Sequence, residues 1–252
     1  MITGERVTVP DAGFNPTFQR HVAAYRLAAP LLPSGRVLDL GCGNGHSYRE
    51  LAPRISVGID VEPSVLVGQG RETHVADMRE LPFADATFAS VIAVQSLEHV
   101  PDPEAVLGEV VRVLEPGGRA VFVTPNRLTF GVPTEIIDPY HYVEYDADEL
   151  RLTCARFFDT VELLGLHGSA RYLRIVEEER RRLRLLLAMD PLRLRRLVPR
   201  RPRQRLYDWR LRRDRIHPRE GALQITPEDF HLSGEPVEAA LDLVAVCDLS
   251  RA

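Results

Sequence analysis

The sequence contains no lysine, so all 32 of its basic residues are arginine, which we attribute to genome base composition and not to chemistry. It has three widely spaced cysteines, Cys42, Cys154 and Cys247, and no CxxC pair. This pattern predicts neither a disulfide framework nor a zinc site, and it favours a reducing compartment. No window approaches the roughly 20 apolar residues of a membrane-spanning helix, and the first residues do not have the pattern of a signal peptide. We therefore expect a cytoplasmic protein without a membrane span.

Opposite charges are segregated along the chain. Residues 171–220 hold 18 arginines and 7 acidic residues, although the whole chain has a net charge of −4. The spacing of leucines there predicts two or three short amphipathic helices interrupted by prolines. Such a segment is typical of a helix at an anionic membrane surface, of a lid over an anionic substrate, or of a solvated insertion. Nucleic acid is a less favoured partner because only Tyr172, Tyr207 and Trp209 could stack on bases.

Strand and helix patterns alternate in the first two thirds of the chain. A helix is expected to begin at Pro16 and end before Pro33, followed by helices over 44–52 and 63–70, over 102–115, and from about 146 to 158. Seven strands are predicted, in the segments RVLDL, ISVGID, ETHVADM, ATFASVIAVQS, RAVFVTP, TVELLGL and ALDLVAVCDL. This alternation predicts a mostly parallel sheet that is covered on both faces.

Three glycines at alternate positions follow the first strand. Gly41, Gly43 and Gly45 lie where the chain leaves a strand and turns, and missing side chains let a ligand approach the backbone. The dinucleotide-binding fingerprint is GxGxxG, whereas this loop is GxGxG, with His46 at the place of the last glycine. A turn of this kind also occurs for structural reasons alone, so further residues are needed as evidence that the loop binds a ligand.

Two aspartates supply that support. Asp60 ends the second strand, where a carboxylate can accept hydrogen bonds from both ribose hydroxyls. Its alternative role is to cap a helix that begins at Pro63. Asp77 follows the third strand and could accept a hydrogen bond from an exocyclic adenine amine, while Met78 packs on the base.

The segments VLDLGCGNG, GIDVEPSVL and VADMRELPFADATFASVIAVQSLEHVPDPEAVLGEVVRVLEPGGRAVFVTPN together resemble the successive motifs of class I S-adenosylmethionine-dependent methyltransferases. The resemblance covers about residues 20–165 and the final strand, and it is greatest to the small-molecule, type 11-like branch. It implies an α/β fold with a Rossmann-like, doubly wound, seven-stranded sheet whose last strand is antiparallel. Together with the arginine-rich segment, it predicts a core over 1–169 that includes the N-terminal helix, an arginine-rich helical insertion over 170–225 between the last two strands, and a C-terminal part of the core over 226–252.

The resemblance implies S-adenosyl-L-methionine as the cofactor. Asp39, Gly41, Cys42 and Gly43 would line its methionine end, which Tyr25 would close. Asp60 would hold the ribose, Val61 and Met78 would flank the adenine, and Asp77 would meet the adenine amine. Gln95 would face the cofactor from the end of the fourth strand.

Two loops at the carboxyl edge of the sheet supply candidates for catalysis. Glu98 and His99 follow the fourth strand, and His141 and Glu144 lie after the fifth. Glu98, His99 and His141 are the predicted catalytic residues, because a positioned base helps when the acceptor is a hydroxyl. Each also has a structural alternative, since a residue here can simply support the cofactor loop or bond to the backbone. The histidines are scattered, so the sequence predicts no metal site.

The predicted function is methyl transfer to a small molecule, a sugar or a lipid-linked glycan, with O-methylation favoured. The arginine-rich insertion could attach the protein peripherally to an anionic membrane. The alternatives are an RNA or protein methyltransferase, a binding protein with a methyltransferase fold, and a nicotinamide-dependent oxidoreductase. The sequence determines neither the acceptor nor the oligomeric state.

Overall fold

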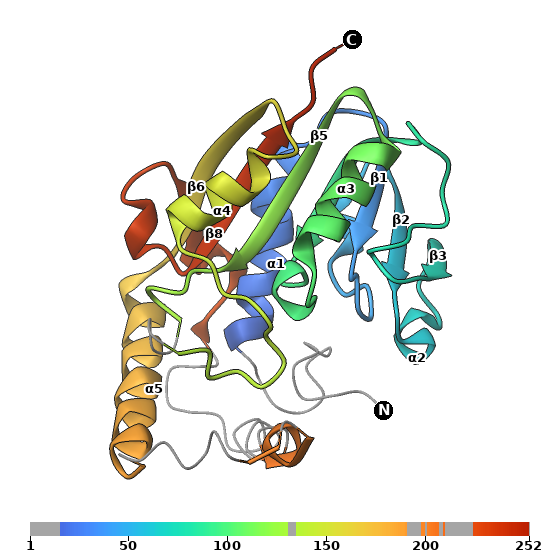
Figure 1. Ribbon diagram of the computed structural model, residues 1–252. Coiled ribbons are helices and arrows are strands. Elements are labelled where there is room, and N and C mark those ends of the chain that lie inside the picture. Colours follow the sequence, from blue (N-terminus) through green and yellow to red (C-terminus); the bar gives the residue numbers. More distant parts are fainter. Residues whose placement is uncertain are drawn as a thin grey trace.

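An eight-stranded sheet forms the centre of the protein in the computed structural model, which describes residues 16–130, 135–190, 198–199, 201–206, 209 and 224–251. The strands lie in the order β3-β2-β1-β4-β5-β8-β6-β7 (Figure 1). Their bounds are β1 Arg36–Leu40, β2 Ile55–Asp60, β3 Glu72–Val75, β4 Phe88–Val94, β5 Leu114–Pro125, β6 Thr160–Gly168, β7 Phe230–Ser233 and β8 Asp242–Asp248.

The strand directions confirm the predicted Rossmann-like sheet. Strands β1 to β5 pair in parallel, and the last strand, β8, runs antiparallel between β5 and β6. All seven predicted strands are present. The sequence analysis missed an eighth, β7, which pairs antiparallel with β6 at the edge of the sheet. Its four residues are too few to show a hydrophobic period.

Helices cover both faces of the sheet (Figure 1). On one face lie α3 (Pro103–Val113) and α4 (Ala147–Cys154), which bury Leu107 and Leu150 in a large apolar core. On the other face α1 (Pro16–Ala28) and its 3-10 extension η1 (Ala29–Leu31) bury Ala24 and Ala28, in a second core that also holds Tyr172 of α5 (Ala170–Ala188). The sheet is therefore doubly wound, as predicted.

Side-chain caps fix where the helices of the first face begin. Asp102 accepts a hydrogen bond from the backbone nitrogen of Ala105, next to a proline at the first position of α3. Asp146 and Glu149 form a reciprocal capping box at the start of α4. These local signals are visible in the sequence, which explains why both helix starts are predicted well.

The helix predicted over 44–52 is wrong. The structure has only a 3-10 helix there, η2 (Tyr48–Leu51). Gly43 and Gly45 have φ values of 52° and 66°, in the left-handed region, so the chain forms a loop where the prediction had a helix start. The helix predicted over 63–70 is also shorter, with α2 spanning Pro63–Leu66.

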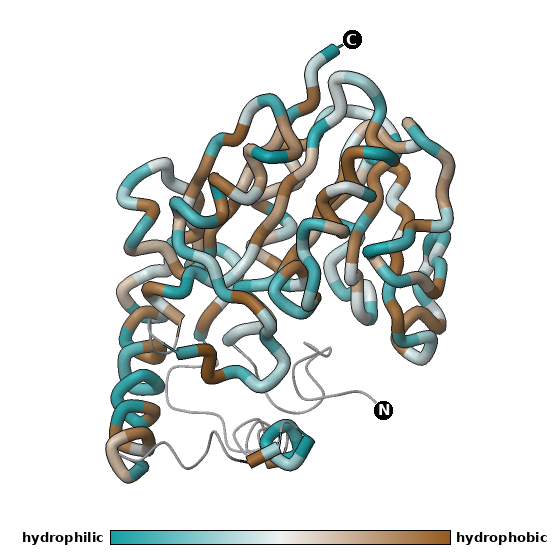
Figure 2. Tube along the Cα trace, viewed as in Figure 1, coloured by the Kyte–Doolittle hydropathy of each residue, from teal (hydrophilic) through white to brown (hydrophobic). Residues whose placement is uncertain are grey.

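The arginine-rich segment begins with α5, which extends away from the sheet (Figure 1). Its residues are mostly hydrophilic, in contrast to those of the apolar strands (Figure 2). Most of the segment after α5, including Leu194 and the arginines Arg193, Arg195, Arg196 and Arg200, lies outside the described residues. Among the described helices, none is both long and apolar enough to cross a membrane. The predicted division of the chain at residues 169 and 225 stays a prediction.

Candidate functional site

The candidate site lies at the carboxyl ends of neighbouring strands. After β1 the chain continues to β2 and β3 on one side, and then crosses to β4 on the other. Open α/β sheets bind ligands at such a switch point. A pocket of about 340 Å³ lies here, within the size range of small-molecule sites. Its lining includes ten predicted site residues, namely Tyr25, Gly41, Cys42, Gly43, Asp60, Val61, Asp77, Met78, Gln95 and His99.

The glycines of the loop after β1 have different roles. A Cβ atom on Gly41 would lie 2.6 Å from the Cβ atom of Ser96, so this glycine permits close packing against the turn after β4. A Cβ atom on Gly43 would meet no atom within 4 Å, and Gly43 lines the pocket. Both have left-handed φ values, 64° and 52°. Gly43 therefore leaves room for a ligand to approach the backbone.

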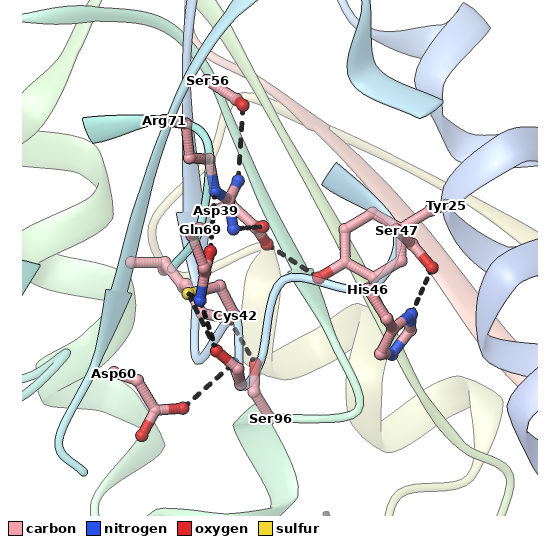
Figure 3. A network of polar contacts seen from close by, with 12 residues as sticks. Tyr25, Asp39, Cys42, His46, Ser47, Ser56, Asp60, Gln69, Arg71 and Ser96 are labelled. Atoms are coloured by element: carbon pink, nitrogen blue, oxygen red, sulfur yellow. Dashed lines mark hydrogen bonds and ion pairs between the residues drawn. The ribbon is translucent and has the colours of Figure 1, made fainter. Parts of the chain in front are cut away.

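Asp60 ties the end of β2 to this loop (Figure 3). Its buried carboxylate accepts hydrogen bonds from the backbone nitrogens of Gly43, at 3.0 Å, and Glu62, at 2.9 Å. The cap of α2 is Glu62, whose side chain accepts a hydrogen bond from the backbone nitrogen of Ser64. The alternative role of Asp60 as the helix cap is therefore wrong, and its carboxylate belongs to the pocket wall.

Asp39 lies behind the wall instead of lining the pocket, and its side chain is 1% exposed. Its two oxygens accept hydrogen bonds from the Tyr25 hydroxyl, at 2.8 Å, and from Arg71 Nη2, at 2.7 Å (Figure 3). Burial, followed by the charge of Asp39, holds the pKa of the Tyr25 hydroxyl well above its usual value. Tyr25 therefore remains a hydrogen-bond donor and connects Asp39 to the pocket surface.

Two further side chains that the sequence analysis missed hold the glycine loop. Gln69 Nε2 donates a hydrogen bond to the carbonyl of Gly43, at 2.7 Å, and Arg71 donates to Gln69 Oε1, at 3.0 Å.

Burial and the nearby Asp39 charge raise the pKa of the Cys42 thiol to about 12, so the thiol is neutral and cannot act as a nucleophile. Cys42 is a wall residue.

Val61, Met78 and Asp77 also line the pocket. Both carboxylate oxygens of Asp77 contact Arg79, with distances of 3.0 Å to Nε and 2.6 Å to Nη2. The hydrogen bond from Arg79 lowers the pKa of Asp77 and so favours its ionised form, which has the greater capacity to accept hydrogen bonds. This ion pair was not foreseen from the sequence.

Gln95 directly follows β4 and has a left-handed conformation, with φ of 52°. Its side-chain nitrogen donates to Asp242 Oδ1, at 2.8 Å, and Arg20 Nε donates to Asp242 Oδ2, also at 2.8 Å. This buried group joins α1, β4 and β8 beside the pocket. A non-glycine residue in the left-handed region costs free energy, and such residues cluster at functional sites.

The predicted catalytic residues gather at the edge of the pocket. His99 of η3 (Leu97–His99) lines the pocket, whereas Glu98 and His141 lie behind it. Burial raises the pKa of Glu98 to about 7. Burial opposes protonation of His141, but the hydrogen bond to Glu144, at 2.8 Å, and the charges of Glu98 and Asp138 outweigh it and raise the pKa of His141. The predicted residues thus form one cluster, of which only His99 reaches the pocket surface.

Comparison with known proteins agrees with this geometry. The family described as a methyltransferase domain matches residues 38–122. A protein of Mycobacterium tuberculosis, named a "probable S-adenosylmethionine-dependent methyltransferase", is 37% identical over 179 residues, which are 66% of this chain and 65% of that protein. A protein of the same description from Mycolicibacterium smegmatis is 32% identical over 179 residues, covering 67% of this chain and 69% of the relative.

Shorter matches include the tocopherol O-methyltransferase of Arabidopsis thaliana, 32% identical over 155 residues, 53% of this chain and 43% of the relative. Another is the ubiquinone biosynthesis O-methyltransferase of Hahella chejuensis, 40% identical over 108 residues, 38% of this chain and 45% of the relative. The solved structure of an S-adenosylmethionine-dependent methyltransferase from Thermotoga maritima shares the fold, with a TM-score of 0.61, 15% identity, and coverage of 92% of this chain and 90% of that one. The chain belongs to the family of S-adenosylmethionine-dependent methyltransferases.

Proposed function

We propose that the protein transfers the methyl group of S-adenosylmethionine to a small-molecule acceptor, and that the cofactor binds in the pocket at the switch point. The pocket itself carries this proposal. Ten residues expected from widely separated motifs line one cavity of about 340 Å³, with an open glycine, Gly43, and a buried carboxylate, Asp60, on its wall. Residues with only structural roles would not be expected to line the same cavity.

The residues of the pocket fit each part of the cofactor, namely the ribose, the adenine and the methionine. The Asp60 carboxylate accepts two backbone hydrogen bonds, which fix its direction, and a carboxylate is the type of acceptor that both ribose hydroxyls require. Val61 and Met78 would flank the adenine, and Asp77 would accept from its amine. Gly41, Cys42, Gly43, Tyr25 and Gln95 would surround the methionine end. Asp39 would act as a positioning residue through Tyr25.

S-adenosylmethionine, when bound, supplies a methyl group on a positively charged sulfur. The protein must then align the acceptor and exclude water, and a strong base is not required for every acceptor. With a hydroxyl acceptor, a new O–C bond would form while the C–S bond breaks, the electron pair of that bond would stay with sulfur, and the hydroxyl proton would pass to water or to a base at the acceptor end of the site. We propose that Glu98, His99 and His141 form the acceptor end of the site.

The acceptor class rests on the relatives and on the pocket. The names of relatives specify small-molecule O-methylation, of tocopherol and in ubiquinone biosynthesis, and also C-methylation in ubiquinone and menaquinone biosynthesis, so they support a small-molecule acceptor. O-methylation stays a prediction. A sugar or lipid-linked acceptor is a finer proposal that depends on the arginine-rich segment. Peripheral attachment to an anionic membrane stays a prediction of the same segment, and a cytoplasmic location stays a prediction of the cysteine pattern and the first residues.

The alternatives are an RNA or protein methyltransferase and a binding protein that has lost transfer. Sparse aromatic residues in the basic segment disfavour RNA. A pocket of about 340 Å³, with His99 on its lining, favours an acceptor small enough to enter.

Calorimetric titration with S-adenosylhomocysteine tests the cofactor proposal without knowledge of the acceptor. We expect one site with micromolar affinity, roughly 8 kcal/mol. Asp60→Ala should weaken binding at least tenfold, because the ribose hydroxyls lose their acceptor. Glu72→Ala, an exposed acidic residue on β3 outside the pocket, is the matched control and should leave affinity unchanged. Binding of NAD without binding of S-adenosylhomocysteine would refute the proposal.

A further inference from the structure

Three potential metal ligands meet at the acceptor end of the pocket. Glu98 and His99 come from η3, after β4, and His141 comes from the loop after β5. One ligand atom from each residue lies within 4.8 Å of the others. The two imidazole rings are 4.9 Å apart between centroids, at an interplanar angle of 66°. Local spacing in the sequence could not reveal this group, because His141 is distant in the chain.

The second nitrogen of each ring is held in the way that metal-binding histidines are held. His141 Nδ1 lies 2.8 Å from Glu144 Oε1, and His99 Nδ1 lies 3.3 Å from the carbonyl oxygen of Tyr140. A histidine that binds a metal almost always donates its other ring N–H to a carboxylate or a carbonyl, which fixes the tautomer. Both rings would therefore bind a cation through Nε2.

Glu98 supplies an independent observation. Its side chain is fully buried, and Oε2 accepts a hydrogen bond from Thr124 Oγ1, at 3.1 Å. Its other oxygen, Oε1, is buried without a hydrogen-bond partner among the described residues. A buried polar atom of this kind needs an explanation, and an ion is one of the few available. Asp138 adds a second carboxylate nearby, with Oδ2 at 4.0 Å from His141 Nε2.

We propose that Glu98, His99 and His141 bind one divalent transition-metal cation. Two imidazoles and one carboxylate suit zinc, manganese or iron(II) and leave coordination positions open. Because His99 lines the pocket, an open position would face the acceptor. This role of the cation rests on the proposed function, and it narrows the acceptor to a molecule with an oxygen that binds metals. Binding of the cation itself does not depend on methyl transfer.

Cobalt(II) is a suitable probe because its visible absorption reports coordination by histidine. The full-length protein is treated with a chelator, freed of it and titrated with cobalt(II), and then with zinc as competitor. We expect one equivalent of cobalt to produce the visible bands and one equivalent of zinc to remove them. His141→Gln and His99→Gln should each weaken cobalt affinity at least tenfold.

A second histidine pair provides the matched control. His167 and His231 stack at 5.5 Å between ring centroids on β6 and β7, away from the pocket, and could also attract metal. His231→Gln should leave cobalt affinity unchanged. If the bands are absent, or are lost in His231→Gln but kept in His141→Gln, the metal proposal is wrong. If His141→Gln fails to fold, His99→Gln on the pocket surface decides the question alone.

Titration of the same samples with S-adenosylhomocysteine separates the two proposals. Binding of S-adenosylhomocysteine without stoichiometric cobalt overturns only the metal site. Binding of cobalt without S-adenosylhomocysteine overturns the proposed function and leaves the metal site intact.

Discussion

Asp39 is held by two partners from distant parts of the chain, the Tyr25 hydroxyl and the Arg71 guanidinium. The Asp39 and Arg71 side chains are 1% and 4% exposed, so this ion pair is buried. Arg71→Met should lower the free energy of unfolding by about 3 to 5 kcal/mol, because it leaves a buried carboxylate without its counter-charge. Urea denaturation measures the change.

Arg156→Met is the control for that substitution. Arg156 pairs with Glu104, but these side chains are 61% and 47% exposed, so the loss should stay below about 1 kcal/mol. The double variant Asp39→Asn with Arg71→Met should recover part of the stability, because no buried charge is then left alone. Equal costs for the two arginine substitutions would contradict the buried ion pair.

His46 lies between the glycine loop and η2, and its presence should make the fold sensitive to acid. Burial lowers the pKa of His46 to about 4 from 6.5, so between these values the unfolded chain binds more protons than the folded one. Stability therefore rises with pH across this interval and is lost as the pH falls. His46→Gln should reduce the stability lost between pH 7 and pH 5 by about 1 to 2 kcal/mol, measured by urea denaturation at both values.

An unchanged loss of stability in His46→Gln would show that the histidine is not buried in its neutral form.

Local motifs predicted the residues of the pocket wall, but not the residues that support them. Gly41, Gly43, Asp60 and Asp77 could be found because each lies at or just after the end of a recognisable strand. Arg71, Gln69 and the pair Arg20 and Asp242 could not, since their partners lie far away in the sequence and no spacing indicates the contact.

The loop between β1 and η2 is the element on which the cofactor proposal depends most. Gly43→Ala puts an alanine at a φ of 52°, which costs roughly 1 to 2 kcal/mol of stability, but its Cβ atom meets no protein atom within 4 Å. The variant should fold and should bind S-adenosylhomocysteine at least tenfold more weakly, because the methyl group occupies space that the ligand needs. Calorimetry measures the affinity.

Gly68 provides a control because its backbone also has a left-handed conformation. It has a φ of 79°, a Cβ atom there would also meet nothing within 4 Å, and it lies outside the pocket. Gly68→Ala should cost similar stability and keep the wild-type affinity. Equal affinities of the two alanine variants would show that the ligand does not approach Gly43.

Elements with strong local signals were predicted well, and elements defined by tertiary pairing were not. Capping residues and proline marked the starts of α3 and α4, and continuous apolar runs marked β1 and β4. By contrast, β7 exists because it pairs with β6, and the glycine loop prevents the helix expected over 44–52. Both outcomes depend on contacts that a single window of sequence does not contain.

At the scale of the whole molecule, the order of the strands determines where the residues of the candidate site lie. The motifs follow β1, β2, β3 and β4, and the parallel arrangement of these strands brings all of their carboxyl ends to one edge. That is why a reading of isolated motifs could anticipate one pocket. The segregated arginines of residues 171–220 are a second property of the whole chain, and their role at a membrane or over a substrate stays a prediction.

A crystal structure of the protein with S-adenosylhomocysteine tests the central claim most directly. It should place the ribose hydroxyls on the Asp60 carboxylate, the adenine between Val61 and Met78, and the homocysteine end against Gly41 and Gly43. A ligand bound elsewhere, or this pocket empty in crystals grown at saturating ligand, would contradict the account.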